Sequence, residues 1–126
     1  MKHRWLIALW TILTLAACSG KTSPSAKVIE GYFKALVSKD TQKAISLSCA
    51  AWEQNAQLDA DTFANYPARL DNIACNESGQ EGNYTLVACS GKLSLDYNGE
   101  IQEIDLADRV YLTVQEGGEW RMCGYK

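Results

Sequence analysis

The chain has 126 residues, of which 47% are hydrophobic and 21% are charged, and this length and composition suit one folded domain. The formal net charge of −3 argues against binding to nucleic acid, which needs a basic surface, and against adhesion to anionic lipid headgroups. The composition therefore indicates a small, mildly acidic domain.

The first 17 residues are arranged like a secretory signal peptide. Lys2 and Arg4 form a basic start, and a thirteen-residue apolar run follows over 5–17. This run is shorter than the about 20 apolar residues that a membrane-spanning helix needs. We therefore expect residues 1–17 to be a signal peptide and the protein to be exported.

The sequence Leu15-Ala16-Ala17-Cys18 ends this segment. It resembles the lipobox of bacterial lipoproteins, Leu-Ala-(Gly/Ala)-Cys, at every position. The resemblance implies that the Cys18 thiol is diacylglycerated, that the chain is cut before it, and that the new amino-terminal residue carries the lipid, with acyl chains such as palmitate. Ser19 at the next position implies sorting to the outer membrane in a cell with two membranes. The alternative is an ordinary signal peptide with a chance cysteine.

Cleavage at this site would leave a lipidated cysteine and polar tether over 18–25, followed by one domain over 26–126. Loss of Lys2 and Arg4 leaves ten basic against fifteen acidic residues. We expect this protein to be anchored by lipid to the cell membrane or the outer membrane, facing the periplasm or the exterior.

Helical periodicity marks the start of the domain. Apolar residues recur at helical spacing after Ser23 and Pro24, which predicts a helix over 24–38. A second helix over 41–56 would point Cys49 and Trp52 inward. A third, shorter helix is expected to begin near 59–61 and to end around 66–67, because the residue before a proline is disfavoured in a helix.

From about residue 69 the period changes to two, and turn sequences recur at Asn98-Gly99 and Gly117-Gly118. This pattern predicts an antiparallel meander. The four expected strands span about 69–77, 84–97, 100–115 and 119–125.

The hairpin turns predict how these strands pair. Centring one hairpin on Asn98-Gly99 places Leu93 opposite Ile104, Cys89 opposite Asp108 and Val87 opposite Val110, on one mostly apolar face.

Counting from Gly117-Gly118 places Cys123 opposite Leu112 and Tyr125 opposite Val110 on that same buried face. Tyr111 and Trp120 then fall on the outer face.

Four cysteines follow Cys18, and an even number in a short exported chain indicates two disulfides. A loop centred on Gly82 places Cys75 directly opposite Cys89, within disulfide reach. Elimination then pairs Cys49 with Cys123. The wide, irregular gaps between these cysteines argue against a zinc site, so no metal is expected.

Two segments carry a resemblance to a known superfamily. Residues 28–40, Val-Ile-Glu-Gly-Tyr-Phe-Lys-Ala-Leu-Val-Ser-Lys-Asp, and the ending Glu-Gly-Gly-Glu-Trp-Arg-Met-Cys-Gly over 116–124 resemble the opening helix and last hairpin of the nuclear-transport-factor-2-like (cystatin-like α+β) superfamily. Small bacterial lipoproteins of unknown function within it are the most similar. The resemblance implies a cone-shaped α+β fold, with N-terminal helices packed on the concave face of a four-stranded antiparallel meander.

The superfamily holds isomerases, dehydratases, polyketide cyclases and non-catalytic binding domains, so the fold does not decide the function. Its catalytic sites usually pair Asp with His or Tyr, and the only histidine here, His3, lies in the signal peptide. We expect no catalytic residue and no cofactor. The alternative is that Asp108, the one acid predicted on the buried face, acts as a general base in a cofactor-free isomerase or lyase.

The preferred hypothesis is a non-catalytic, envelope-anchored binding or interaction domain. Its partner surface would be the outer sheet face around Tyr111 and Trp120, used for a protein partner or a homodimer. The runner-up is a carrier of a small apolar ligand in a cavity between helices and sheet. The aromatic and acidic residues predicted to line that cavity are Tyr32, Trp52, Tyr66, Asp108 and Tyr125.

Overall fold

A computed structural model describes residues 22–126, so residues 1–17, expected to be a signal peptide, and Cys18 lie outside the described residues. Three helices and a 3₁₀ turn come first: α1 (Pro24–Val37), α2 (Thr41–Ser46), η1 (Ala50–Trp52) and α3 (Glu53–Asn65). Five strands and a second 3₁₀ turn follow: β1 (Ala68–Glu81), β2 (Tyr84–Tyr97), β3 (Glu100–Asp105), η2 (Leu106–Asp108), β4 (Val110–Glu116) and β5 (Glu119–Tyr125).

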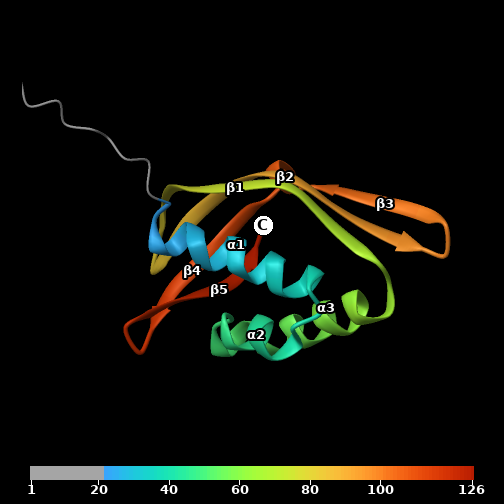
Figure 1. The fold of residues 1–126 in the computed structure, drawn as a ribbon. Coiled ribbons are helices and arrows are strands. Elements are labelled where there is room, and N and C mark those ends of the chain that lie inside the picture. The colour runs from blue at the N-terminus through green and yellow to red at the C-terminus, as the bar shows by residue number, and fades with distance from the viewer. Residues whose placement is uncertain (1–21) are drawn as a thin grey trace, which may run out of the picture.

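The fold is α+β, with the helices lying on one side of a curved antiparallel sheet (Figure 1). This is the nuclear-transport-factor-2-like arrangement that the sequence predicted, with five strands instead of four. Within residues 22–126, no helix combines the length and the apolar character that crossing a membrane requires.

The first helix forms as its sequence predicts. The Ser23 side chain accepts a hydrogen bond from the Ala26 backbone N–H at 3.3 Å, and Pro24 occupies the first turn, where its missing N–H costs nothing. Tyr32 and Phe33 from the apolar stripe are buried, and Phe33 meets the Tyr111 ring edge-on at 5.3 Å. Helix α1 is therefore the centre of the helical layer.

The prediction of one helix over 41–56 is wrong, because the helix ends at Ser46. The chain then runs beside β5, where the Met122 N–H donates to the Leu47 carbonyl and the Cys49 N–H donates to the Met122 carbonyl, each at 2.7 Å. Pairing with a strand edge thus replaces the helical hydrogen bonds of this segment, and helix α3 starts earlier than predicted, at Glu53.

Strand β2 organises the sheet, because its N-terminal half pairs with β4 and its C-terminal half with β3, while β1 runs along its other side. The sheet bends between these halves, where β1 has a register shift between Asp71 and Ala74. Gly91 faces this bulge with φ of +109°, and a β-carbon there would lie 2.7 Å from the Asp71 carbonyl oxygen. The close approach therefore requires glycine.

The predicted third strand over 100–115 is interrupted by the η2 turn, in which the Asp105 carboxylate accepts a hydrogen bond from the Ala107 N–H at 3.0 Å. Before this turn the register is as predicted, with Leu93 opposite Ile104. After it, Val87 pairs with Tyr111 rather than with Val110. A shift of one residue exchanges the two faces of a strand, so every side chain of β4 points to the opposite side from the prediction.

Three predictions are corrected by this shift. Tyr111 is fully buried instead of lying on an outer partner surface. Asp108 is exposed in the turn instead of lying on the buried face. Thr113 points inward, which is tolerated because its hydroxyl donates to the Thr85 carbonyl at 2.8 Å.

The last hairpin begins as predicted, with Glu116 opposite Glu119, but the register shifts before Tyr125, which pairs with Tyr111 rather than with Val110. The irregularity coincides with Gly124, whose φ is +119°. Trp120 packs against the core cluster, on the side of the helices. Its predicted place on the outer face is therefore wrong, because it lies on the same side of β5 as buried Met122.

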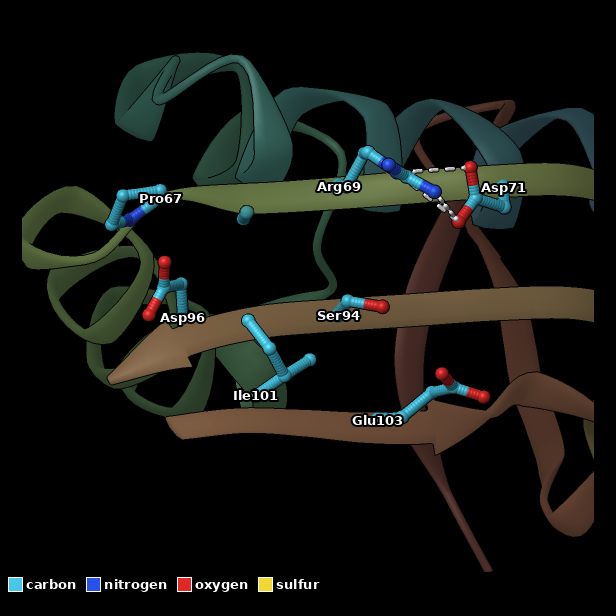
Figure 2. Close-up of a pocket in the computed structure, with 8 residues that line it drawn as sticks. Pro67, Arg69, Asp71, Ser94, Asp96, Ile101 and Glu103 are labelled. Carbon is cyan, nitrogen blue, oxygen red and sulfur yellow. Dashed lines mark hydrogen bonds and ion pairs between the residues drawn. The ribbon is translucent and has the colours of Figure 1, made fainter. Parts of the chain in front are cut away.

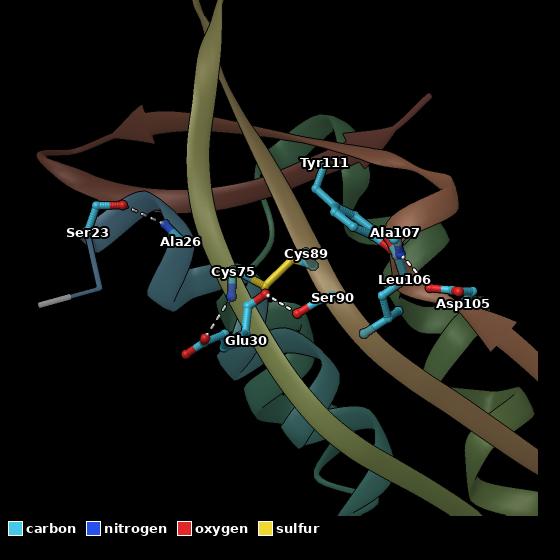
Figure 3. The surroundings of a disulfide bond; sticks show 11 residues. Ser23, Ala26, Glu30, Cys75, Cys89, Ser90, Asp105, Leu106, Ala107 and Tyr111 are labelled. Atoms are coloured by element: carbon cyan, nitrogen blue, oxygen red, sulfur yellow. Dashed lines mark hydrogen bonds between the residues drawn. A yellow bond between two sulfur atoms is a disulfide. The ribbon is translucent and has the colours of Figure 1, made fainter. Parts of the chain in front are cut away.

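Both predicted disulfides are present. Cys75–Cys89 joins directly opposed residues of β1 and β2, and Cys49–Cys123 joins the segment before η1 to β5. Figure 3 shows the first of them near Glu30, whose carboxylate accepts a hydrogen bond from the Cys75 N–H at 3.0 Å. Two disulfides in a chain of this size indicate an oxidising, extracytoplasmic location.

Candidate functional site

The interior between helices and sheet contains a Tyr–Asp pair. The Tyr32 hydroxyl donates to Asp59 Oδ2 at 2.7 Å, and Trp52 Nε1 donates to the Tyr32 oxygen at 3.4 Å. Asp59 was missed by the sequence reasoning. The helical pattern of α3 could have indicated it, because Asp59 shares one face of this helix with three buried residues, Ala56, Ala60 and Phe63.

Burial dominates the electrostatics of this pair. It raises the pKa of the Tyr32 hydroxyl, and the neighbouring Asp59 charge raises that pKa further. Burial also raises the pKa of Asp59, against the opposing effects of the Tyr32 hydrogen bond and the Arg109 charge. Tyr32 is thus a hydrogen-bond donor across the physiological range, and Asp59 is an acceptor held at the edge of the core.

The space beside this pair is small. The cavity has a volume of about 60 Å³ and is lined by Tyr32, Asp59, Arg109 and Tyr125 together with apolar core residues. Ligand pockets usually measure about 300–1,000 Å³, and a water molecule takes about 30 Å³ of liquid. At the wall of the cavity, the Arg109 guanidinium stacks over the Tyr125 ring, 4.1 Å from the ring centroid. The interior has room for about two waters.

The five residues predicted to line a pocket do not converge. Tyr32 and Tyr125 line the small cavity, and Trp52 meets the Tyr125 ring edge-on at 5.7 Å. Tyr66 instead packs on Tyr97, with ring centroids 4.4 Å apart. Asp108 is exposed in η2 and lines none of this cavity.

The outer sheet face has two halves, separated by the bend. The half made by β4, β5 and the N-terminal part of β2 carries an apolar row, which we call the proximal strip. It comprises Tyr84, Leu86, Val110, Leu112 and Val114, of which Tyr84 is exposed and the others are half-buried. A hollow of about 520 Å³ lies beside it, bordered by the Cys49–Cys123 disulfide, Tyr84 and Val114. The one-residue shift at η2 creates this strip.

The other half, made by the N-terminal part of β1, the C-terminal part of β2, and β3, contains a hollow of about 400 Å³ that we call the distal groove (Figure 2). Its lining is mixed, with three acids beside an apolar side chain, Ile101, that is 59% exposed. The lining residues are Pro67, Ala68, Arg69, Asp71, Ser94, Asp96, Ile101 and Glu103.

The two halves lie at opposite ends of the molecule. Figure 1 shows the start of α1 beside the β1–β2 and β4–β5 hairpins, with the β2–β3 hairpin at the far end. A hydrogen bond of 2.5 Å from Ser25 to Glu77 agrees with this placement. Across residues 22–126, no three or more His, Cys, Asp or Glu side chains are grouped so that they could hold a metal ion.

No protein-family model matches the chain, and no curated protein is detectably similar in sequence. Solved structures are similar at low identity. RPA3114, a SEC-C motif containing protein from Rhodopseudomonas palustris, has a TM-score of 0.53 and 10% identity over 82% of this chain and 80% of its own. Pgp2, the helical cell shape determining protein of Campylobacter jejuni, has a TM-score of 0.50 and 12% identity over 79% of this chain. This chain spans 38% of the Pgp2 length.

An NTF2-like protein of unknown function from Cytophaga hutchinsonii aligns with 86% of this chain and 92% of its own, at 11% identity and a TM-score of 0.43. Nothing further rests on this weaker similarity. At such identities the two stronger matches bear on the fold alone.

Proposed function

We propose that this protein is a non-catalytic interaction domain, displayed on the cell envelope by a lipid on Cys18. The observation that carries the proposal is the filled interior. A cavity of about 60 Å³ is small for a ligand, which favours recognition on the surface, and the outer sheet face carries the apolar proximal strip. Native mass spectrometry of the exported protein tests this, and a small molecule that stays bound would favour the ligand-carrier alternative instead.

The anchor is supported by the lipobox-like sequence at 15–18 together with the use of the other cysteines. Both disulfides form among the four later cysteines, so a lipid on Cys18 would not compete with either disulfide. Thr22 lies four positions after Cys18, and a fully extended chain spans at most about 14 Å over that distance. The domain would therefore stand close to the membrane.

Cys18→Ser tests the anchor. The variant is expected to leave the membrane fraction and to lose the acyl mass from its first peptide. Membrane association that survives this substitution would exclude lipid on Cys18 as the anchor.

The partner surface that we propose is the proximal strip, and its occupant is a second copy of the chain. The strip offers both a protruding side chain, Tyr84, and a hollow beside it, which is the self-complementary arrangement that a two-fold interface needs.

The charges around the strip also suit two identical faces. Glu81 pairs with Lys126, Glu119 pairs with Arg121, and the Glu116 carboxylate accepts from the Ala50 N–H at 2.9 Å. Because each of these acids already has a partner, two copies of the strip can approach without strong repulsion.

Light scattering after size-exclusion chromatography tests the dimer. The exported protein in detergent is expected to be a dimer, and Val114→Asp is expected to make it monomeric. Leu58→Asp is the matched control, because Leu58 is an exposed apolar residue on α3, away from the strip. Loss of the dimer in both variants, or a monomeric parent protein, would contradict the assignment.

The alternative of a cofactor-free isomerase or lyase depended on Asp108 lying on the buried face. Asp108 is exposed in η2 and is not among the residues that line the interior cavity, so it is not placed to act on a molecule held there.

A further inference from the structure

We propose that the distal groove binds an extended, cationic segment of a partner protein, with one apolar side chain of that segment resting on Ile101. This site is separate from the proximal strip, and it involves a partner of different chemistry.

The first argument is charge. Three carboxylates, Asp71, Asp96 and Glu103, line the groove. The nearby cations are already engaged, because Arg69 lies 3.1 Å from Asp71, and Lys92 lies 2.9 Å from Glu103. These two ion pairs largely neutralise Asp71 and Glu103, so the lining acid without an ion pair is Asp96. A basic segment is complementary to this remaining negative charge.

The second argument is the edge formed by β3. This strand pairs with β2, and the sheet order places no described strand on its other side. Its sequence over 100–105, Glu-Ile-Gln-Glu-Ile-Asp, holds three acids and no base. Pairing with the β3 of a second copy would therefore bring acids together, whereas an extended segment with Lys or Arg at alternating positions would be attracted.

The third argument is the apolar centre of the groove. Ile101 is 59% exposed and stands opposite Asp96 in the β2–β3 ladder, and Pro67 and Ala68 line the groove from the β1 side. Figure 2 shows Ile101 between Asp96 and Glu103. An exposed isoleucine flanked by acids fits a segment that alternates basic and apolar side chains, because such a segment covers the apolar atoms and keeps its charges over the carboxylates.

The position of the groove suits capture of a partner. It lies at the end of the domain opposite the start of α1 (Figure 1). If Cys18 is the anchor, as the proposed function holds, the groove faces away from the membrane.

Fluorescence anisotropy with a labelled, capped hexapeptide of alternating Lys and Ile tests the proposal. We expect saturable binding to the exported protein in detergent, weakened as salt is raised. A hexapeptide of alternating Glu and Ile, and one of alternating Lys and Ser, are both expected to bind at least about tenfold more weakly.

Two variants locate the site. Glu103→Lys and Ile101→Ser are each expected to weaken binding about tenfold. Asp61→Lys is the matched control, because it makes the same change of charge at an exposed position on α3 and is expected to bind like the parent protein. Circular dichroism confirms that each variant is folded.

Three outcomes would overturn the proposal: no saturable binding of the Lys-Ile peptide, equal weakening by Asp61→Lys, or equal binding of the Lys-Ser peptide. None of them alters the dimer or the lipid anchor, which are measured separately. Failure of this inference and failure of the proposed function are thus distinguishable.

Discussion

The two disulfides are predicted to contribute unequally to stability. Cys49 and Cys123 are 74 positions apart, whereas Cys75 and Cys89 are 14 apart. In the chain-entropy model, closing the longer loop removes more freedom from the unfolded chain, which gives about 4.5 kcal/mol for the first disulfide and about 3 kcal/mol for the second.

The assay is urea unfolding of the exported protein with each cysteine pair replaced by alanine. With an m-value of about 1.5 kcal/mol per molar urea, the midpoint should fall by about 3 M without Cys49–Cys123 and by about 2 M without Cys75–Cys89. Three of the four cysteines are buried and Cys123 is half-buried, so the packing losses of the two pairs are comparable. An equal or larger loss from the Cys75–Cys89 pair would refute the argument from loop length.

The remaining predictions concern the interior and the bend. Asp59→Asn should stabilise the protein at neutral pH, because burial raises the pKa of Asp59 and makes its charged form unfavourable in the folded state. In thermal melts, the stability gained by Asp59→Asn should shrink as the pH falls from 7 towards 4, because Asp59 of the parent protein then takes up a proton. A stability gain that grows as the pH falls would contradict this prediction. Tyr32→Phe should cost about 1–3 kcal/mol in urea unfolding by leaving Asp59 without its donor, and an unchanged midpoint would refute this. Gly91→Ala should lower the melting temperature, because the added β-carbon would lie against the Asp71 carbonyl and strain the backbone by about 1–3 kcal/mol or more. A melting temperature equal to that of the parent protein would show that the backbone at the bend relaxes around the added methyl group.

Features that depend on near neighbours could be predicted from the sequence. The start of α1 follows from Ser23 and Pro24, and the two short hairpins follow from Asn98-Gly99 and Gly117-Gly118. The predicted pairing of Cys75 with Cys89 is also present, but the turn beside it lies between Gly82 and Asn83 rather than on Gly82. The register shift between Glu77 and Gly79 offsets this difference and brings the two cysteines opposite each other.

Features that depend on contacts between residues far apart in the sequence could not be predicted from the sequence. The 41–56 helix is shortened because Leu47 and Cys49 bond to Met122, which a helical pattern does not reveal. The helical pattern could place Asp59 on the buried face of α3, but its hydrogen bond with Tyr32 of another helix could not be predicted.

The outer sheet face shows most clearly what the sequence pattern left undecided. Alternation along residues 100–115 is compatible with either register, because Val110 and Leu112 suit a core as well as Tyr111 does. The η2 turn adds one residue, and from there each β4 side chain exchanges faces, which buries Tyr111 and moves the apolar strip outward. The sequence by itself determined the first helix, the two short hairpin turns and the cysteine pairs. The tertiary structure decided which side of each strand faces the solvent, because that choice depends on a single extra residue whose effect is felt only through pairing with β2.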